Sequence, residues 1–343
     1  MLKRREFLRR LATLFLMLFS GCLGESDISG AIEKKNISIK KKIPLKKYAK
    51  SEVYVIKSDD RENGIKELLK YFDIKSLSGK RIALKANYNS QDPFPASTHI
   101  DTIGTLVDAL KEKGASLVLA ERSGAGDTRK VLKETGILEL ANKKGVDIVI
   151  LNELESSDWI KIKPEGTHWK KGFLFPKVFE DADAIIQTCC LKTHGFSGFT
   201  MSLKNSVGMV AAGGQDGYSY MDELHSSSYK GQMIAEINTA YEPEFIIMDG
   251  IKGFSKGGPD AGTLIEPGIM IASMDRVALD AVGVAVLRVY GTTSEVSEGN
   301  IFEHEQIARA AELGLGVSKS DDIEIIPVNT DAQDICSKIK NEL

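Results

Sequence analysis

The alternation of short apolar runs with amphipathic helical patterns constrains the fold of this chain more than any other feature of its sequence. The apolar runs are often β-branched, which is typical of strands buried on both faces of a parallel sheet. The segments between them carry apolar residues at the spacing of one helix face. We therefore expect an α/β fold, with a mostly parallel sheet and helices on both faces. The runs lie at residues 53–56, 81–84, 116–120, 146–151, 184–187, 245–248 and 269–272.

The helical patterns and the breaks between them indicate the domain organisation. One α/β domain is expected over residues 51–335. Residues 164–172, which begin with proline and end with glycine, are either a boundary between two lobes or a long loop. Helices are expected at residues 61–71, 100–113, 127–134, 229–240, 275–290 and 302–314.

The first residues have the order of an export signal. A basic stretch at residues 3–10 is followed by an apolar run at 11–19, which is well short of the roughly 20 residues that span a bilayer. Arg4-Arg5 within the basic stretch resembles a twin-arginine signal, and the residues that end at Cys22 resemble the lipobox of bacterial lipoproteins. These resemblances imply a signal peptide at residues 1–21 and a lipid on Cys22.

The implied location is the cell envelope, with a lipid anchor in the membrane and the protein body on the extracytoplasmic side. Residues 22–50 then form a basic tether, since eight lysines and one acidic residue lie between positions 33 and 50. This tether is either solvated or in contact with anionic lipid headgroups.

Charge and cysteine content exclude several classes of function. The chain has 45 Lys+Arg against 48 Asp+Glu, a net charge of −3, whereas a dedicated nucleic-acid binder is expected to be basic. We expect no nucleic-acid partner. Cys189 and Cys190 are adjacent and Cys336 is remote, so no pair has metal-ligand spacing and no metal site is predicted.

The residues that follow the expected strands are the candidates for a functional site, because ligands bind outside the carboxyl ends of parallel strands. The densest group follows the run at 184–187 and contains Lys192, His194, Lys204 and Asn205. Lysines attract a carboxylate or phosphate, and a histidine moves a proton near neutral pH. We predict Lys192, His194 and Lys204 as catalytic, with Asn205 as a ligand contact.

Four further residues at strand ends are predicted to surround the same ligand: Lys85, Asn87, Asp249 and Asp275. Asp275 is also well placed as a helix N-cap. Asp280 lies in an otherwise apolar helix and needs a partner. It either holds a lysine or histidine of the site or forms plain buried hydrogen bonds.

Three segments together resemble the domain-of-unknown-function 362 family. They are residues 182–208 with Lys192-Thr193-His194 and Lys204-Asn205, residues 242–262, and residues 272–316. The resemblance covers roughly residues 53–326. Many members of that family carry ferredoxin-like cysteine motifs, which this chain lacks. The resemblance implies no established reaction.

A local resemblance to the lactate racemase family, which uses a nickel-pincer cofactor, adds a mechanism. His194 and Lys204 are ten residues apart and flank a Gly-Phe-Ser-Gly run. The resemblance implies that His194 is the proton-transfer base and Lys204 the attachment point of the cofactor, with His225 as a loose candidate for the nickel ligand. Two features differ from that family. Phe199 stands where the family has a second glycine, and the Gly-Phe-Ser-Gly run lies closer in sequence to the histidine than it does there.

These observations leave several functions open. The leading hypothesis is an exported, membrane-anchored enzyme that binds an anionic small molecule or a cofactor of unknown identity at the lysine and histidine pocket. The alternatives are a non-catalytic ligand-binding lipoprotein, an accessory protein for a redox or iron–sulfur partner, and a racemase-like nickel-pincer enzyme.

Overall fold

The computed structural model describes residues 49–214 and 216–343. The predicted signal peptide, Cys22 and all but the end of the predicted tether lie outside the described residues. Within the described part of the chain, no helix is both long enough and apolar enough to cross a membrane.

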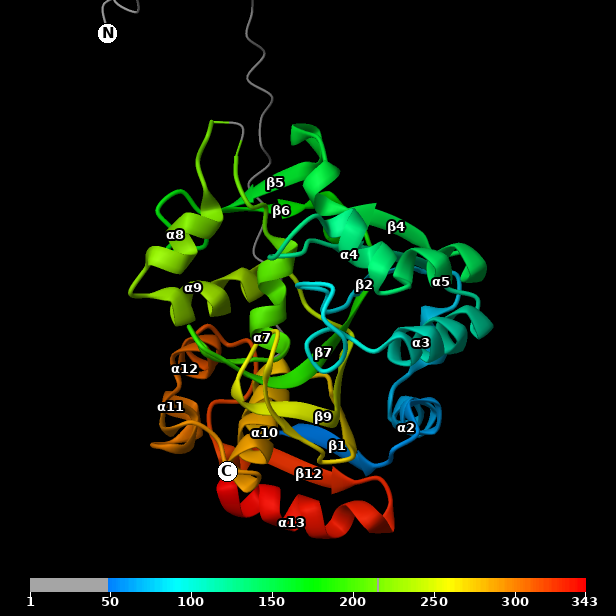
Figure 1. Ribbon diagram of the computed structural model, residues 1–343, viewed down its shortest axis with the longest axis vertical. Helices are drawn as coiled ribbons and strands as arrows, with labels where there is room; N and C mark the ends of the chain where they lie inside the picture. The colour runs from blue at the N-terminus through cyan, green and yellow to red at the C-terminus, as the bar shows by residue number, and fades with distance from the viewer. Residues whose placement is uncertain (1–48, 215) are drawn as a thin grey trace, which may run out of the picture. The chain divides into compact units, whose positions relative to one another are not determined.

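One large sheet organises the described chain, and its strands follow the order β12-β1-β11-β9-β7-β2-β3-β4 (Figure 1). Neighbouring strands on this path are parallel, except where β11 pairs with β1 and β9. The predicted α/β fold with a mostly parallel sheet is therefore confirmed. The bounds are β1 Ser51–Lys57, β2 Arg81–Lys85, β3 Ser116–Glu121, β4 Asp147–Ile150, β7 Ala184–His194, β9 Phe245–Gly257, β11 Ile269–Ser273 and β12 Ile323–Pro327.

Helices cover both faces of this sheet because successive strand residues point to opposite sides. In β1, Val53 and Val55 pack in the core beneath α10, α12 and α13, whereas Tyr54 and Ile56 pack in the core beneath α2 and α3. The helix bounds are α2 Arg61–Leu68, α3 Ile100–Glu112, α4 Thr128–Glu134, α5 Ile137–Lys144, α6 Lys177–Glu180, α7 Ser202–Asn205, α8 Tyr220–Ser226, α9 Lys230–Ile237, α10 Arg276–Val289, α11 Ser294–Ser297, α12 Glu305–Glu312 and α13 Gln333–Glu342.

A smaller two-stranded sheet lies beside the main one, formed by β5 (Trp159–Ile162) and β6 (Phe173–Pro176). Residues 164–172 connect these two strands. Trp169 in this connection is buried in a core shared with α9, and its indole N–H donates to the Met233 carbonyl at 3.0 Å. A lobe boundary at 164–172 stays a prediction.

Strands β7 and β9 extend past their other neighbours in the sheet and stay parallel to each other up to Lys192 and Phe254. Each also pairs with a short antiparallel strand that follows it in the sequence. β7 pairs with β8 (Gly198–Thr200), so that His194 stands opposite Gly198, and β9 pairs with β10 (Gly262–Ile265). Gly253 of β9 passes so close to β7 that a Cβ there would lie 2.5 Å from the Leu191 carbonyl oxygen. Glycine is therefore required where the two extensions meet.

Asp275 secures the start of the most buried helix, α10. Its carboxylate accepts hydrogen bonds from the backbone N–H groups of Val277 (2.7 Å) and Ala278 (3.0 Å), as an N-cap does. It also accepts from the Ser51 hydroxyl at 2.6 Å and from the Val317 N–H at 2.8 Å. One buried side chain thus joins α10, the start of β1 and the segment before β12.

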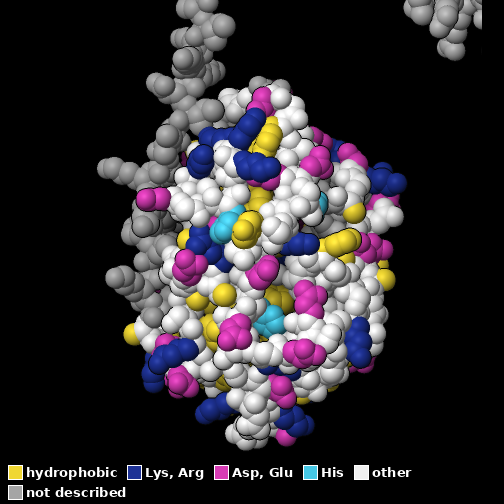
Figure 2. All heavy atoms as spheres, turned by 90° about the vertical axis from the view of Figure 1, so that its left-hand side faces the viewer, with side chains coloured by type: hydrophobic (Ala, Val, Ile, Leu, Met, Phe, Trp, Pro, Cys, Tyr) yellow, Lys and Arg dark blue, Asp and Glu magenta, His cyan; other side chains and the backbone are white. Residues whose placement is uncertain are grey.

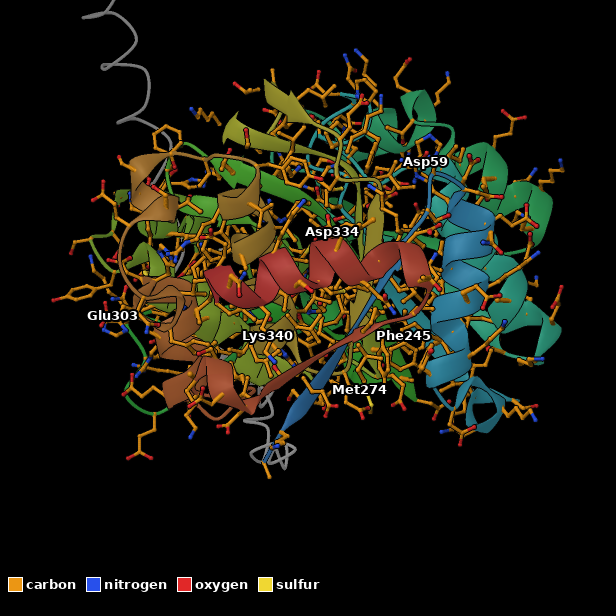
Figure 3. All side chains as sticks on the ribbon, turned by 90° about the horizontal axis from the view of Figure 1, so that it is seen from below. Asp59, Phe245, Met274, Glu303, Asp334 and Lys340 are labelled. Atoms are coloured by element: carbon orange, nitrogen blue, oxygen red, sulfur yellow. The ribbon has the colours of Figure 1, made fainter. Side chains whose placement is uncertain are left out.

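Substitution Asp275→Ala is expected to lower the free energy of unfolding by roughly 2–4 kcal/mol, because it removes a cap and leaves two further buried donors unpaired. Urea unfolding followed by circular dichroism measures the change. The matched control is Asp334→Ala on α13 (Figure 3), whose exposed carboxylate forms an ion pair with Lys338. Equal losses in both variants would contradict this account of Asp275.

Candidate functional site

A cavity of about 660 Å³ opens at the carboxyl ends of β2, β3 and β7. Strand β8, the short helix α7 and the pair α8 and α9, which Figure 1 shows on its left-hand side, complete its wall. Its volume is in the range of small-molecule and cofactor pockets. Its position is the one that parallel sheets give to their ligands.

Six of the eight residues predicted for the site line this cavity, and two do not. The two that lie outside it are Asp249 and Asp275. The six that line it are Lys85, Asn87, Lys192, His194, Lys204 and Asn205.

A buried ion pair forms the base of the cavity. The Lys85 ammonium donates to both carboxylate oxygens of Glu121, at 2.7 and 2.9 Å, and both side chains are 1% exposed. The same ammonium donates to the Asn205 side-chain oxygen at 3.2 Å and to the Ala86 carbonyl. Burial lowers the pKa of Lys85 and raises that of Glu121, and their attraction opposes both shifts.

Two asparagines and a second lysine extend this network. The Asn87 amide donates to Asn205 at 3.1 Å, and the Asn205 amide donates to the Thr188 carbonyl at 2.9 Å. The fully buried Lys192 donates to the Asn87 side-chain oxygen at 2.9 Å and to the Ala96 carbonyl. Burial lowers the pKa of Lys192, which has only these neutral oxygens as partners. The loop after β2 is thereby fixed to β7.

Lys204 differs from both of these lysines. It is partly exposed on α7, it lines the cavity, and its ammonium forms no hydrogen bond or ion pair with any described residue. Burial, and then the charges of Lys192 and Arg122, lower its pKa to about 8. About a tenth of Lys204 is therefore a neutral amine at pH 7.

His194 faces the same cavity as a neutral imidazole. Burial, and then the charges of Lys204 and Lys192, lower its pKa to about 3. Its Nδ1 accepts the backbone N–H of Phe196 at 3.0 Å, so the ring proton is on Nε2. That Nε2–H has no partner among the described residues. The site thus presents a fixed hydrogen-bond donor from this side chain.

Helices α8 and α9 bring two further basic side chains to the site. His225 of α8, which the racemase resemblance offered only as a loose candidate, lines the cavity, and so does Lys230 of α9, which the sequence did not indicate. Burial, and then the charge of Lys204, lower the pKa of His225. Figure 2 shows the face of α8 and α9, where Lys and Arg side chains gather in the upper part.

Hydroxyl groups that the sequence did not indicate also belong to the lining. Three of them are buried without a hydrogen-bond partner in the described chain: Tyr88, Ser197 and Thr200. Buried polar groups are normally paired, so these hydroxyls have unused capacity to bind a polar ligand.

Asp249 has another set of partners. Its fully buried carboxylate accepts from the Arg61 guanidinium of α2 and from the Thr102 hydroxyl of α3, both at 2.7 Å. Its second oxygen accepts the Ile251 N–H at 3.2 Å. The predicted ligand role of Asp249 therefore has no support from its position, and the same holds for Asp275, whose carboxylate caps α10.

Asp280 supports the site by binding the first turn of α7. Its carboxylate accepts the Ser202 N–H at 2.8 Å, the Ser202 hydroxyl at 2.6 Å and the Leu203 N–H at 2.9 Å. These donors belong to the first turn of α7, the helix that carries Lys204 and Asn205. Asp280 thus holds the element that bears a site lysine, through backbone bonds and not through the lysine itself.

The three described cysteines lie in the interior. Cys189 and Cys190 are in the buried part of β7 and Cys336 is in α13, and all three are free thiols whose pKa burial raises. Within residues 49–214 and 216–343, no group of three or more His, Cys, Asp or Glu side chains is arranged to hold a metal ion.

The pH dependence of stability tests the environment of Asp280. Burial raises its pKa to about 7, so between pH 4 and 7 the folded chain binds a proton that the unfolded chain releases. Stability from this group is highest at low pH and is lost as the pH rises through 7. The side chain in Asp280→Asn cannot ionise, so we expect the unfolding free energy of this variant to rise relative to that of the wild type as the pH increases from 4 to 7. Urea unfolding at pH 4, 5.5, 7 and 8 measures the difference. A fall of the variant relative to the wild type over this interval would contradict the prediction.

Comparison with known proteins places the chain in a family. A family model described as Domain of unknown function (DUF362) matches residues 82–285. The chain is similar to the thylakoid-associated protein sll1697 of Synechocystis sp., with 26% identity over 213 residues, which are 62% of this chain and 64% of that protein. The match therefore spans less than two thirds of that relative's length.

One solved structure has a low similarity to this chain. It is the lactate racemase apoprotein from Thermoanaerobacterium thermosaccharolyticum, with 16% identity and a TM-score of 0.40 over 59% of this chain and 50% of that one. The family match rests on sequence and covers more than half of this chain. The chain belongs to the domain-of-unknown-function family DUF362.

Proposed function

We propose that this protein is an enzyme that binds an anionic small molecule in the cavity and moves a proton on it. The observation that carries the proposal is Lys204, an amine without a partner among the described residues, in one cavity with the fixed Nε2–H donor of His194. An amine with a pKa of about 8 takes up and releases protons near neutral pH.

The charges of the lining favour an anion. Five lysine and arginine side chains and two carboxylates line the cavity. One of the carboxylates, Glu121, is already paired with Lys85. The other, Asp260, accepts only long hydrogen bonds, from Asn89 at 3.4 Å and Ser90 at 3.3 Å. A carboxylate or phosphate would offset the remaining positive charge and accept the free hydroxyl donors.

The tautomer of His194 assigns its role in this proposal. A ring nitrogen that carries a proton cannot remove another one, so His194 acts as a donor to an oxygen of the substrate, where negative charge develops. Lys204 in its neutral form is then the base. This division of roles reverses the one that the racemase resemblance implies for His194.

Proton exchange in D₂O tests the proposal across many candidate substrates at once. The full-length protein is incubated with a panel of small carboxylates and phosphate esters, and loss of C–H signals is followed by NMR. We expect exchange on at least one compound, and a loss of 100-fold or more in His194→Gln and in Lys204→Arg. His304→Gln, which changes a histidine outside the cavity lining, is the control. Unchanged ligand binding without any exchange would favour a non-catalytic binding protein and overturn the enzyme proposal.

A second candidate is an enzyme with a cofactor attached to Lys204, as in the nickel-pincer hypothesis. It is favoured by the free Lys204 amine and by His225, which lines the same cavity. If such a group is bound, Lys204 would hold it covalently and His225 would be its metal ligand. The group would then accept a hydride or a proton from the substrate in a racemase-like reaction.

We propose further that the protein is exported and held at the membrane by a lipid on Cys22. The basic and apolar residues 3–19 and the lipobox-like end of the signal support this location. The relative described as thylakoid-associated is consistent with a membrane location.

One mass measurement tests both the anchor and the cofactor. Protein exported by its own signal is purified, and its intact mass and metal content are determined. The anchor predicts a chain that begins at Cys22 and carries the mass of a lipid. Cys22→Ala is expected to move the protein from the membrane fraction to the soluble one. A chain that retains residues 1–21 would contradict the anchor.

The same measurement tests the cofactor. A covalent cofactor predicts an additional mass that is absent in Lys204→Arg. A chain without any adduct on Lys204 would contradict the attached cofactor.

A further inference from the structure

The lysines of the cavity are held in different ways. Lys85 is paired with Glu121, and Lys192 is held by Asn87 and the Ala96 carbonyl. Their amines are therefore already engaged. Lys204 projects from α7 into the same cavity, and no described residue accepts a hydrogen bond from it. Its amine is thus available to react with a bound molecule.

The surroundings of Lys204 favour its neutral, nucleophilic form. Burial and the nearby charges of Lys192 and Arg122 oppose a further positive charge. Arg122 is fixed in place, since it donates to the Val207 carbonyl at 2.6 Å and to the Val210 carbonyl at 2.7 Å. A lysine amine placed beside fixed cations in a partly desolvated site is the arrangement that activates lysine toward carbonyl carbon.

Donors for the oxygens of a reacting molecule lie in the same lining. The His194 Nε2–H has no described partner, and the Thr200 and Ser197 hydroxyls are buried and unpaired. Thr200 of β8 lies opposite Lys192 in the β7–β8 pair, so this hydroxyl is on the strand that pairs with the extension carrying His194. Buried hydroxyls without partners are uncommon in native proteins, and a bound oxygen would satisfy them.

We propose that the Lys204 amine forms an imine with a carbonyl compound that also bears a carboxylate, such as a 2-oxo acid. The proposal rests on the proposed function, because it names the substrate class of the same cavity. While the imine exists, the Lys204 nitrogen is bonded to the substrate, so it activates the neighbouring C–H bond as an electron acceptor in place of acting as a free base. The carboxylate would offset the positive charge of the lining, with Lys230 as a second cation without a described partner. The carbonyl carbon would face Lys204.

The reaction is balanced without a redox partner. The lone pair of the Lys204 Nζ forms a bond to the carbonyl carbon, and the electrons of the C=O π bond move to oxygen, which takes a proton. Loss of a proton from nitrogen gives the carbinolamine. The C–O bond then breaks, the oxygen leaves as water with a proton supplied by the site, and the remaining N–H proton is retained or released. The net change is one carbonyl and one amine to one imine and one water.

Borohydride trapping tests this proposal. The full-length protein is incubated with pyruvate as the probe, reduced with sodium borohydride and digested for peptide mass spectrometry. Reduction converts the imine to a stable secondary amine, so we expect the peptide with Lys204 to gain the mass of pyruvate less one oxygen atom. Acetone, which has the carbonyl but no carboxylate, is expected to label that peptide at least tenfold less.

Three variants complete the test. Lys204→Arg is expected to abolish the adduct, and Lys230→Ala to lower its yield several-fold at limiting pyruvate. Lys340→Ala, which alters an exposed lysine on α13, is expected to leave it unchanged (Figure 3). Absence of an adduct at Lys204, or equal labelling by acetone, would overturn the imine proposal. If pyruvate or other anions still bind in that case, the proposed anion-binding enzyme stands, whereas loss of all binding would overturn both.

Discussion

The buried pair of Lys85 and Glu121 is the interaction on which the site depends. It joins the carboxyl ends of β2 and β3, and Asn205 brings α7 onto the same ammonium. Removing two charges from water costs several kcal/mol per ion, so such a pair is stable only when hydrogen bonds satisfy its remaining atoms. Here the Ala86 carbonyl and the Arg122 N–H complete those bonds. The interaction therefore fixes position more than it adds stability.

Once this base is fixed, the electrostatics of the cavity follow. Glu121 is paired with Lys85, so its negative charge offsets little of the positive charge of the other basic groups. Lys204 and His194 consequently lie in a positive, partly desolvated site, which lowers the pKa of each. Burial is the larger cause of both shifts, and the positive charges add to it. Those same charges are the basis of the affinity for an anionic ligand that we propose.

The sequence predicted the parallel strands and the residues at their ends because apolar runs report burial directly, and all seven predicted runs are strands. It missed five strands of the described chain, which are β5, β6, β8, β10 and β12. Of these, β8 and β10 are short and depend on the extensions of β7 and β9. Six predicted site residues share the cavity because parallel strands end at one edge. Lys230 escaped prediction, since only tertiary packing of α8 and α9 brings it to β7. Asp249 lies outside the cavity lining because β9 continues past it to Gly257, so that Asp249 is inside the strand and its side chain faces Arg61 of α2.

Residue type alone does not determine the environment of a side chain in this cavity, since three of its lysines have three different sets of partners. Lys85 has a carboxylate partner, whereas Lys192 has neutral oxygens as its acceptors among the described residues and connects a loop to a strand. Lys204 has no acceptor among the described residues, and Asp280 anchors α7 through the first turn of this helix. A carboxylate in contact with the Lys204 ammonium would have offset its charge and raised its pKa. Because Asp280 holds α7 by its first turn, support of the helix does not engage the Lys204 amine, and the reactivity that we propose for this amine requires that it stay unengaged.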